Sequence, residues 1–402
     1  MKKGIDIHNY KKRLESAQRK VARAAISDLN KQKIEEFCDY VLVDGMSIAR
    51  VERYYGILVQ FAEWLEVDFT SATKEDMVRV MRILHEKDFT VWTKATYKKM
   101  LKRFYKWLSG TGEYPETVSW INSKVKKTER RQLTSSELLT PEEVHKMVDA
   151  ARHPRDKAFV SLLYESGCRV GELASVQIKN VAIDEHGAKL LVDGKTGQRV
   201  VRVITSTPYL VTWLQMHPSR DDPEAPVWVN VGTYSKHAVM QYNAISTMLR
   251  KLASSAGIRK QCNPHMFRHA RASYLADHLT EFQMNQYFGW VQGSEMASTY
   301  VHMDGRKIDE TLLQMHGMKP VQKKEMETAR RCPRCGTINV PDAKYCMKCA
   351  AILNVSVAAQ LAEDALRERE MLESQDNRMG LLFRDPEFRT VYMQKVKQYG
   401  IE

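Results

Sequence analysis

Six residues whose side chains can act on phosphate esters occur along the chain within four short sequence patterns. The first pattern reads Gly-Cys-Arg-Val-Gly-Glu-Leu and the second is the turn sequence Gly-Lys-Thr-Gly. The third reads His-Met-Phe-Arg-His, and the fourth is Phe-Gly-Trp followed by Ser-Thr-Tyr-Val-His. Taken singly each pattern is weak, because a lone arginine usually lies at the surface and an aromatic side chain usually packs in a core. In chain order the residues are Arg169, Lys195, His265, Arg268, Trp290 and Tyr300, with Glu172 and His269 as neighbours.

Two arginines and a tyrosine are suited to attack on a phosphodiester. The non-bridging oxygens of a phosphate repel a nucleophile, and two guanidinium groups neutralise them through paired hydrogen bonds. Arg169 and Arg268 are the candidates, and they would also stabilise the additional charge of the transition state. His265 would add a hydrogen-bond donor or assist proton movement, while His269 either does the same or orients Arg268.

Tyr300 is the candidate nucleophile. A free tyrosine has a pKa of about 10, so its attack as a phenolate needs nearby positive charge or a base, which the two arginines and the first histidine can supply. The leaving 5′ hydroxyl must collect a proton, and Lys195 at the tip of a hairpin is the natural donor. Trp290 can offer its indole N–H to the phosphate, and Glu172 is expected to orient Arg169 rather than to touch DNA.

The order and spacing of these residues resemble the tyrosine recombinase (phage-integrase-like) family, and the resemblance covers roughly residues 27–318. It implies a site-specific DNA recombinase, or integrase, that forms a 3′-phosphotyrosyl intermediate and rejoins the strand without ATP or a catalytic metal. It also implies double-stranded DNA as the partner and a tetramer acting on two DNA sites. Three departures stand out: Trp290 replaces a more frequent histidine, the gap to Tyr300 is slightly long, and the chain continues to residue 402.

Two other functions remain open from the sequence. A type IB topoisomerase-like enzyme would share the constellation but relax DNA as a monomer, without a defined site. A non-catalytic DNA-binding protein would use a C-terminal zinc ribbon to recruit a partner, but such a protein has no need of Tyr300. The long segment after Tyr300 hints at a mobile element or a specialised regulator.

Amphipathic helices should position these residues, beginning with a basic helical arm over residues 1–26 and a four-helix, DNA-binding (core-binding) domain over residues 27–121. Apolar residues step by three and four along the expected helices, which begin near 28, 48, 74 and 93. One face of the fourth helix gathers cations suited to a phosphate backbone, although a plain solvated face is the simpler alternative. These cations are Lys94, Lys98, Lys99, Lys102, Arg103 and Lys106.

A basic linker over residues 122–138 leads into the expected catalytic domain, residues 139–318. The linker carries Lys126, Lys127, Arg130 and Arg131, which should also meet DNA. The catalytic domain is expected to be α+β: mainly helical, with a small antiparallel sheet. Its hairpin strands are predicted over 189–193 and 199–204, on either side of the Gly-Lys-Thr-Gly turn.

Four late cysteines have the spacing of a structural zinc site. Cys332 with Cys335, and Cys346 with Cys349, form two Cys-x-x-Cys knuckles that fit one tetrahedral Zn²⁺ with four thiolates. A redox pair or free thiols are the alternative. We therefore expect a zinc ribbon over residues 330–352, followed by a helical tail over 353–402 that is a candidate for self-association.

Composition agrees with a nucleic-acid partner. The formal net charge is +13 and the pI about 9.2, which favours a polyanion, with an anionic membrane surface as the second choice. No apolar stretch approaches the ~20 residues of a membrane span, and the basic start lacks the apolar core of a signal peptide. We therefore expect a cytoplasmic protein, associated with the nucleoid when bound to DNA, without a membrane partner.

Overall fold

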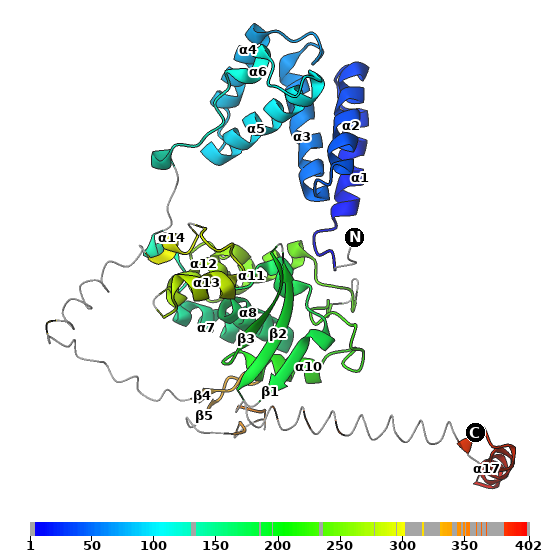
Figure 1. The fold of residues 1–402 in the computed structure, drawn as a ribbon. Helices are drawn as coiled ribbons and strands as arrows, with labels where there is room; N and C mark the ends of the chain where they lie inside the picture. Colours follow the sequence, from blue (N-terminus) through cyan, green and yellow to red (C-terminus); the bar gives the residue numbers. More distant parts are fainter. Residues whose placement is uncertain are drawn as a thin grey trace. The chain divides into compact units, whose positions relative to one another are not determined.

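The structure is a computed structural model (Figure 1). It describes residues 5–129, 134–184, 186–194, 196–232, 236–276, 278–294, 296–301, 316, 330–339, 344–346, 349, 351–353, 359, 363, 367 and 382–399. The chain forms two compact units. One is His8–Leu133, and the other combines Met1–Ile7 with Thr134–Glu402. The unit boundary at Leu133 lies inside the expected linker, and within the described residues no helix has both the length and the apolar character to cross a membrane.

The first unit is entirely helical in its described residues. Side-chain caps explain where its helices begin: Ser27 caps α2, and Thr73 forms a capping box with Asp76 at the start of α4. The expected start of the fourth long helix at Thr93 is late, because Thr90 accepts a hydrogen bond from the Thr93 N–H and starts α5 at Val91. The helices are α1 (Tyr10–Arg23), α2 (Asp28–Val43), α3 (Ile48–Leu65), α4 (Lys74–Glu86), α5 (Val91–Leu108) and α6 (Glu116–Ser119).

The expected basic arm, residues 1–26, is not a simple solvated tail. Helix α1 packs against this unit, because Val21 is buried in its core and Leu14 and Ala17 lie against the same cluster. Arg13 adds an ion pair to Glu52 of α3 at 2.9 Å. The residue before the helical unit belongs elsewhere: Ile7 is buried in the second unit, and its carbonyl accepts the N–H of Tyr242 at 2.9 Å.

The second unit is mainly helical with a small antiparallel sheet, as expected. Strands β1 (Val181–Asp184), β2 (Gly187–Gly194) and β3 (Gly197–Val203) pair in the order β1-β2-β3. The hairpin of β2 and β3 confirms the predicted pair, whereas no pattern in the sequence indicated β1. The helices are α7 (Pro141–Ala150), α8 (Pro154–Ser166), α9 (Val170–Ala174), α10 (Thr207–Gln215), α11 (Tyr242–Ser255), α12 (Pro264–Leu275), α13 (Glu281–Phe288) and α14 (Ser298–Val301).

Helix α8 forms the centre of this unit. Its side chains Phe159, Leu162 and Leu163 are fully buried, and it packs against α7, α10, α12 and β3. Its end is fixed by Gly167, which adopts φ +55, a left-handed conformation that glycine adopts without strain. The chain therefore turns sharply after α8 and delivers the next residues directly to α9.

A small structure follows later in the chain and packs on the second unit. Strands β4 (Arg330–Arg331) and β5 (Ile338–Asn339) pair antiparallel. Ile352 is buried against Val211 of α10 and Ile183 of β1, and Arg331 pairs with Asp149 at 3.4 Å. Three 3-10 turns, at Lys127–Glu129, Ser135–Glu137 and Ile178–Asn180, and helix α17 (Pro386–Tyr399) complete the described elements.

Candidate active site

Arg169 is presented by the turn between α8 and α9. It is the N-cap of α9, and Glu172 in the first turn returns to accept both its backbone N–H at 2.9 Å and its guanidinium at 2.8 Å. The Glu172 side chain is 3% exposed, whereas that of Arg169 remains 36% exposed. The carboxylate therefore holds Arg169 in place and leaves part of its guanidinium open to a ligand, in line with the orienting role expected for Glu172.

Arg268 lies on α12 and is buried. Its guanidinium donates to the carbonyl of Gly167 at 2.9 Å and to that of Phe288 at 2.7 Å. Burial and then the charge of Arg169 lower the pKa of Arg268 to about 10. It therefore stays charged at neutral pH, and its bond to the carbonyl of Gly167, two residues before Arg169, brings both cations into one site.

The two histidines of α12 occupy different positions. Their rings contact each other edge to face at 4.5 Å between centroids, and His269 Nδ1 lies 2.5 Å from the phenol oxygen of Tyr300. His269 is thus the histidine that meets the candidate nucleophile, while His265 is more exposed. Partial desolvation, then Arg268, then Arg169 lower the pKa of His265.

The contact between His269 and Tyr300 joins two neutral groups. Burial, then His265 and Arg268, lower the pKa of His269 to about 4. Burial raises the pKa of Tyr300 to about 12, against the opposing charge of Arg268. At neutral pH the phenol therefore keeps its proton and the imidazole is uncharged, so the phenol can donate to Nδ1 in the tautomer that carries its proton on Nε2.

Trp290 packs flat on the nucleophile. Its ring is stacked on Tyr300 with centroids 5.6 Å apart and an interplanar angle of 2°, and it is stacked on Phe288 at 4.7 Å. The guanidinium of Arg268 lies over both Phe288 and Trp290, at 5.1 and 5.5 Å from their centroids. Trp290 therefore packs directly on Tyr300, which is 4% exposed.

Lys195 lies outside the described residues, but the turn around it is partly described. The hydroxyl of Thr196 donates to the carbonyl of Gly289 at 3.0 Å. This bond ties the hairpin to the residue immediately before Trp290.

Arg199 is a site residue that was not predicted from the sequence. It donates to Glu172 at 2.8 Å and to the carbonyl of Tyr287 at 3.0 Å, and its side chain is 12% exposed. The available signal was alternation along β3, since period 2 places Arg199 on the same face as the buried Val201 and Val203.

The four late cysteines converge. Their sulfur atoms all lie within 4.8 Å of one another, with Cys332 and Cys349 at 3.4 Å and Cys335 and Cys346 at 3.5 Å. Thiolates at corners of a tetrahedron with Zn–S bonds of about 2.3 Å stand about 3.8 Å apart. The set therefore fits one metal ion bound by four sulfurs.

The basic face of α5 is present, and three of its six cations contact neutral polar groups rather than acids. Lys94 and Lys98 both approach His85, and Lys102 donates to the carbonyls of Ser119 and Ile121. Among the six cations of this face, the described contacts give a carboxylate partner to Arg103 alone, Asp44 at 3.2 Å.

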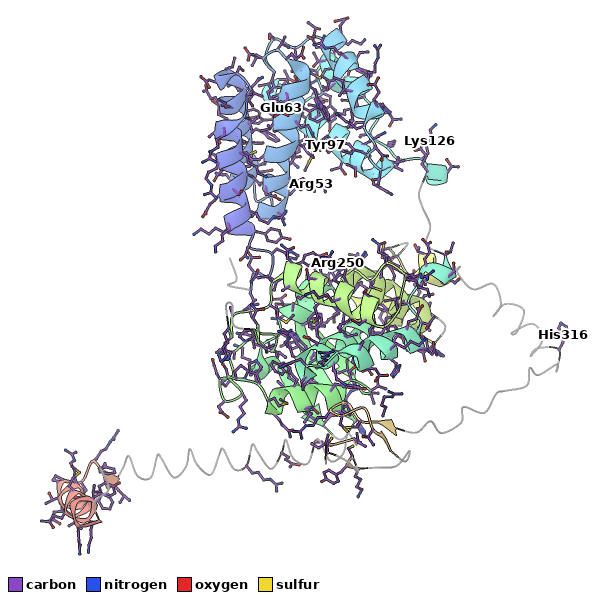
Figure 2. All side chains as sticks on the ribbon, turned by 180° about the vertical axis from the view of Figure 1, so that it is seen from behind. Arg53, Glu63, Tyr97, Lys126, Arg250 and His316 are labelled. Atoms are coloured by element: carbon purple, nitrogen blue, oxygen red, sulfur yellow. The ribbon has the colours of Figure 1, made fainter. Side chains whose placement is uncertain are left out.

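Helix α5 is fixed on the unit from its other side, where Tyr97, labelled in Figure 2, donates to Gln60 of α3 at 2.7 Å. Arg130, Arg131 and the side chain of Lys127 lie outside the described residues; Lys126 is described and exposed.

Comparison with known proteins identifies the family. The sequence pattern of the phage integrase family matches residues 137–306. Tyrosine recombinase XerD of Bifidobacterium longum is 24% identical over 301 residues, which covers 70% of this chain and 96% of the relative. Tyrosine recombinase XerA of Pyrococcus furiosus is 26% identical over 251 residues, covering 62% and 82%.

Solved structures share the fold. The post-cleavage complex of XerH site-specific recombinase with palindromic difH substrate superposes with a TM-score of 0.54 at 16% identity, covering 79% of this chain and 98% of that one. A lambda integrase dimer bound to a COC′ core site also gives 0.54, at 14% identity, covering 68% and 77%. Residues 137–306 therefore carry a phage integrase family domain, and the relatives that the chain matches over most of their length are tyrosine recombinases.

Proposed function

We propose that this protein is a site-specific DNA recombinase in which Tyr300 forms a covalent bond to a DNA phosphate. The observation that carries the proposal is the single cluster of Tyr300, His269 and the two arginines Arg169 and Arg268. A buried phenol with a hydrogen-bond partner, near the guanidinium of Arg268 and in the same site as Arg169, is suited to in-line attack on a phosphodiester.

The strand cleavage step exchanges one phosphate ester for another. The Tyr300 oxygen attacks the phosphorus, its bond to phosphorus forms, and the bond from phosphorus to the 5′ oxygen breaks. The product is a 3′-phosphotyrosyl link and a free 5′ hydroxyl. Because the ester bond is conserved, the reverse attack by a 5′ hydroxyl rejoins DNA without ATP.

Each remaining site residue has a proposed part in this step. Arg169 and Arg268 bind the non-bridging oxygens, and Trp290 supports the phosphate and the nucleophile. Lys195 protonates the leaving 5′ oxygen. Since these side chains supply the positive charge, cleavage should need no divalent cation.

His269 is the proposed acceptor of the Tyr300 proton. It is uncharged at neutral pH, and its Nδ1 lies within hydrogen-bond distance of the phenol oxygen, where the Nε2-protonated tautomer accepts the phenol proton. His265, for which the sequence left open hydrogen-bond donation or proton movement, lies one helical turn away and contacts the His269 ring. Its proposed part is to donate to the phosphate.

Nicked duplexes that release the leaving fragment test the covalent step, since they trap the protein on DNA. The parent protein should form an adduct in the presence of EDTA, and Tyr300→Phe should form none. His269→Ala should slow adduct formation more than His265→Ala at pH 7. Adducts formed equally by Tyr300→Phe would contradict the proposal, and so would an immediate requirement for Mg²⁺.

DNA is the proposed partner of the basic helix α5 and of the segment with Lys126, Lys127, Arg130 and Arg131. Solved lambda integrase complexes include a dimer on a core site and a tetramer on a Holliday junction. A tetramer on two duplexes is the proposed assembly here, in the cytoplasm. Names and complexes of the relatives favour recombination over topoisomerase-like relaxation and over DNA binding without cleavage. Joining of two separate duplexes distinguishes recombination from relaxation.

A structural Zn²⁺ is the proposed occupant of the four-cysteine cluster. Four thiolates that close the coordination shell give a structural role, because no position is left open for a substrate. Metal analysis of the purified chain should find one zinc per chain, and Cys335→Ser should lower this value. Cys262→Ser, which changes a cysteine outside the cluster, is the matched control.

A further inference from the structure

Arg199 is a largely enclosed cation, with a side chain 12% exposed, that joins three separate parts of the active site. It lies on β3 and faces inward, and through Glu172 it reaches Arg169 on the turn before α9. Its Nε donates to the carbonyl of Tyr287 at 3.0 Å, at the end of α13. The segment that carries Trp290 therefore contacts the β2–β3 hairpin at two points, through Arg199 on β3 and through Thr196 in the turn.

Glu172 is shared between two guanidinium groups. Its Oε1 accepts from Arg169 and its Oε2 accepts from Arg199, each at 2.8 Å. Burial opposes ionisation of this carboxyl, but the hydrogen bonds from Arg199 and Arg169 outweigh it and lower the pKa of Glu172. A carboxylate this deeply buried needs both cations, because a buried charge without adequate partners is strongly unfavourable.

The charge count explains what Arg199 adds. Arg169 and Glu172 alone form a neutral pair, whose guanidinium would attract a phosphate weakly. Arg199 contributes a further positive charge to the same carboxylate, so the group of three is cationic. The Arg169 side chain, 36% exposed, can then turn its remaining N–H donors toward a ligand.

Packing around Arg199 leaves little freedom. A methyl group on Gly289 would stand 3.0 Å from Arg199 Nη1 and 3.1 Å from the Thr196 hydroxyl oxygen. The same nitrogen, Arg199 Nη1, is buried without a hydrogen-bond partner among the described residues. The guanidinium is thus held at this position by contacts on two sides rather than by a saturated hydrogen-bond network.

We propose that Arg199 is a positioning residue for DNA cleavage. By sharing Glu172, it keeps Arg169 oriented toward the scissile phosphate and gives the group of Arg169, Glu172 and Arg199 a net positive charge. The inference rests on the proposed function, since it assigns a part in the same reaction. Arg199 acts through Glu172 and does not itself touch DNA.

Single-turnover cleavage of trapping duplexes tests this role with three variants. Arg199→Gln should slow adduct formation by about 100-fold, in the range seen when a transition-state donor is removed. Arg199→Lys keeps the charge and should recover at least tenfold of that loss. Arg202→Gln is the matched control, because Arg202 lies on the same strand but pairs with Asp184 at 2.7 Å, and its rate should stay near that of the parent.

Chemically altered phosphates identify the route. A methylphosphonate at the scissile position lacks one negative oxygen, so the defect of Arg199→Gln relative to the parent should shrink to below tenfold on this substrate. A 5′-bridging phosphorothiolate has a leaving group that needs no proton, and it should leave the 100-fold defect unchanged. Rescue by the phosphorothiolate instead would overturn the inference and assign Arg199 to the Lys195 hairpin.

Failure of the inference is separable from failure of the proposed function. If the parent forms adducts, Tyr300→Phe does not, and Arg199→Gln cleaves as fast as the parent, then Arg199 has no positioning role although the mechanism stands. If the parent forms no adduct, the proposed function itself is wrong. Equal thermal unfolding midpoints of Arg199→Lys and the parent would exclude misfolding as the cause of a slow cleavage rate in that variant. If Arg199→Lys then cleaves as slowly as Arg199→Gln, the part assigned to the positive charge is wrong.

Discussion

The phenol of Tyr300 and the imidazole of His269 show how burial sets chemistry at the scale of single residues. Both groups are neutral at pH 7, since burial moves their pKa values in opposite directions, to about 12 and about 4. Each shift favours the uncharged form. A bound phosphate would add negative charge beside His269 and raise its basicity, so the proton transfer should become easier when substrate is present.

The low pKa of His269 predicts how stability changes with pH. Its folded pKa of about 4 lies below the ordinary 6.5, so between these values the unfolded chain binds more protons than the folded one. The contribution of the neutral imidazole to stability is therefore fully present above about pH 6.5 and is lost as the pH falls towards 4.

Thermal unfolding of the parent and of His269→Gln measures this contribution. The parent should lose more stability than the variant between pH 6.5 and 4, although His265 shifts in the same direction in both proteins. A parallel pH dependence of the two proteins in this range would show that His269 is not buried as a neutral group.

At the scale of helices and strands, the packing is especially close where the β2–β3 hairpin meets α9. A Cβ atom on Gly194 would lie 2.3 Å from Glu172 Oε1, the oxygen that holds Arg169. The hairpin and the carboxylate thus approach each other so closely that only glycine fits without displacement.

Gly194→Ala should therefore push Glu172 away from Arg169. We expect a loss of about 1–3 kcal/mol in the free energy of unfolding, typical of overpacking, together with slower adduct formation. Gly56→Ala on α3 is the control, because a Cβ there meets nothing within 4 Å. Unchanged cleavage by Gly194→Ala would mean that the Glu172 position is not critical.

Sequence patterns predicted the elements well where the signal is local. Capping residues and apolar periodicity placed α2, α3 and α4 close to their observed starts, and the turn glycines indicated the β2–β3 hairpin. Strand β1 escaped because it is four residues long and its burial depends on pairing with β2, which no local pattern encodes. For helix α1 the sequence predicts only a basic arm, because its many cations conceal the apolar positions 14, 17 and 21 that face the core.

Long-range contacts limited what could be said of the site. The order of chemically competent residues singled out Arg268, Trp290 and Tyr300, and the structure places Arg268 over Trp290 and Trp290 on Tyr300. It could not show that His269 rather than His265 contacts Tyr300, because that depends on the rotation of α12 relative to α14. Arg199 was invisible for the same reason, as its partners Glu172 and Tyr287 are far from it in sequence.

Net charge is the property of the whole molecule that bears most on its partner. The formal charge of +13 and the cationic face of α5 predict DNA affinity that falls steeply with salt. Two of these cations already crowd each other, since burial and then the charge of Lys94 lower the pKa of Lys98. An anionic backbone would relieve this repulsion.

Replacing Lys98 and Lys99 by Gln should lower the slope of log affinity against log salt by about 0.9 for each phosphate that is no longer neutralised. The effect should be similar for all DNA sequences, because phosphate contacts carry no sequence information. Lys31→Gln on α2, whose ammonium pairs with Asp28 at 3.2 Å, serves as the control. A slope that stays at the parent value would remove α5 from the DNA interface.

The stacking of Tyr300 on Trp290 has a consequence for the protein in the absence of DNA. A phenol that is 4% exposed, protonated and covered by an indole ring presents no reactive oxygen to the solvent. Reagents that nitrate or iodinate accessible tyrosines should therefore modify exposed residues such as Tyr40 and Tyr114 long before Tyr300. Tyr300 would remain unreactive in the free protein, and its capacity to form a covalent bond would arise only on the DNA that the protein acts upon.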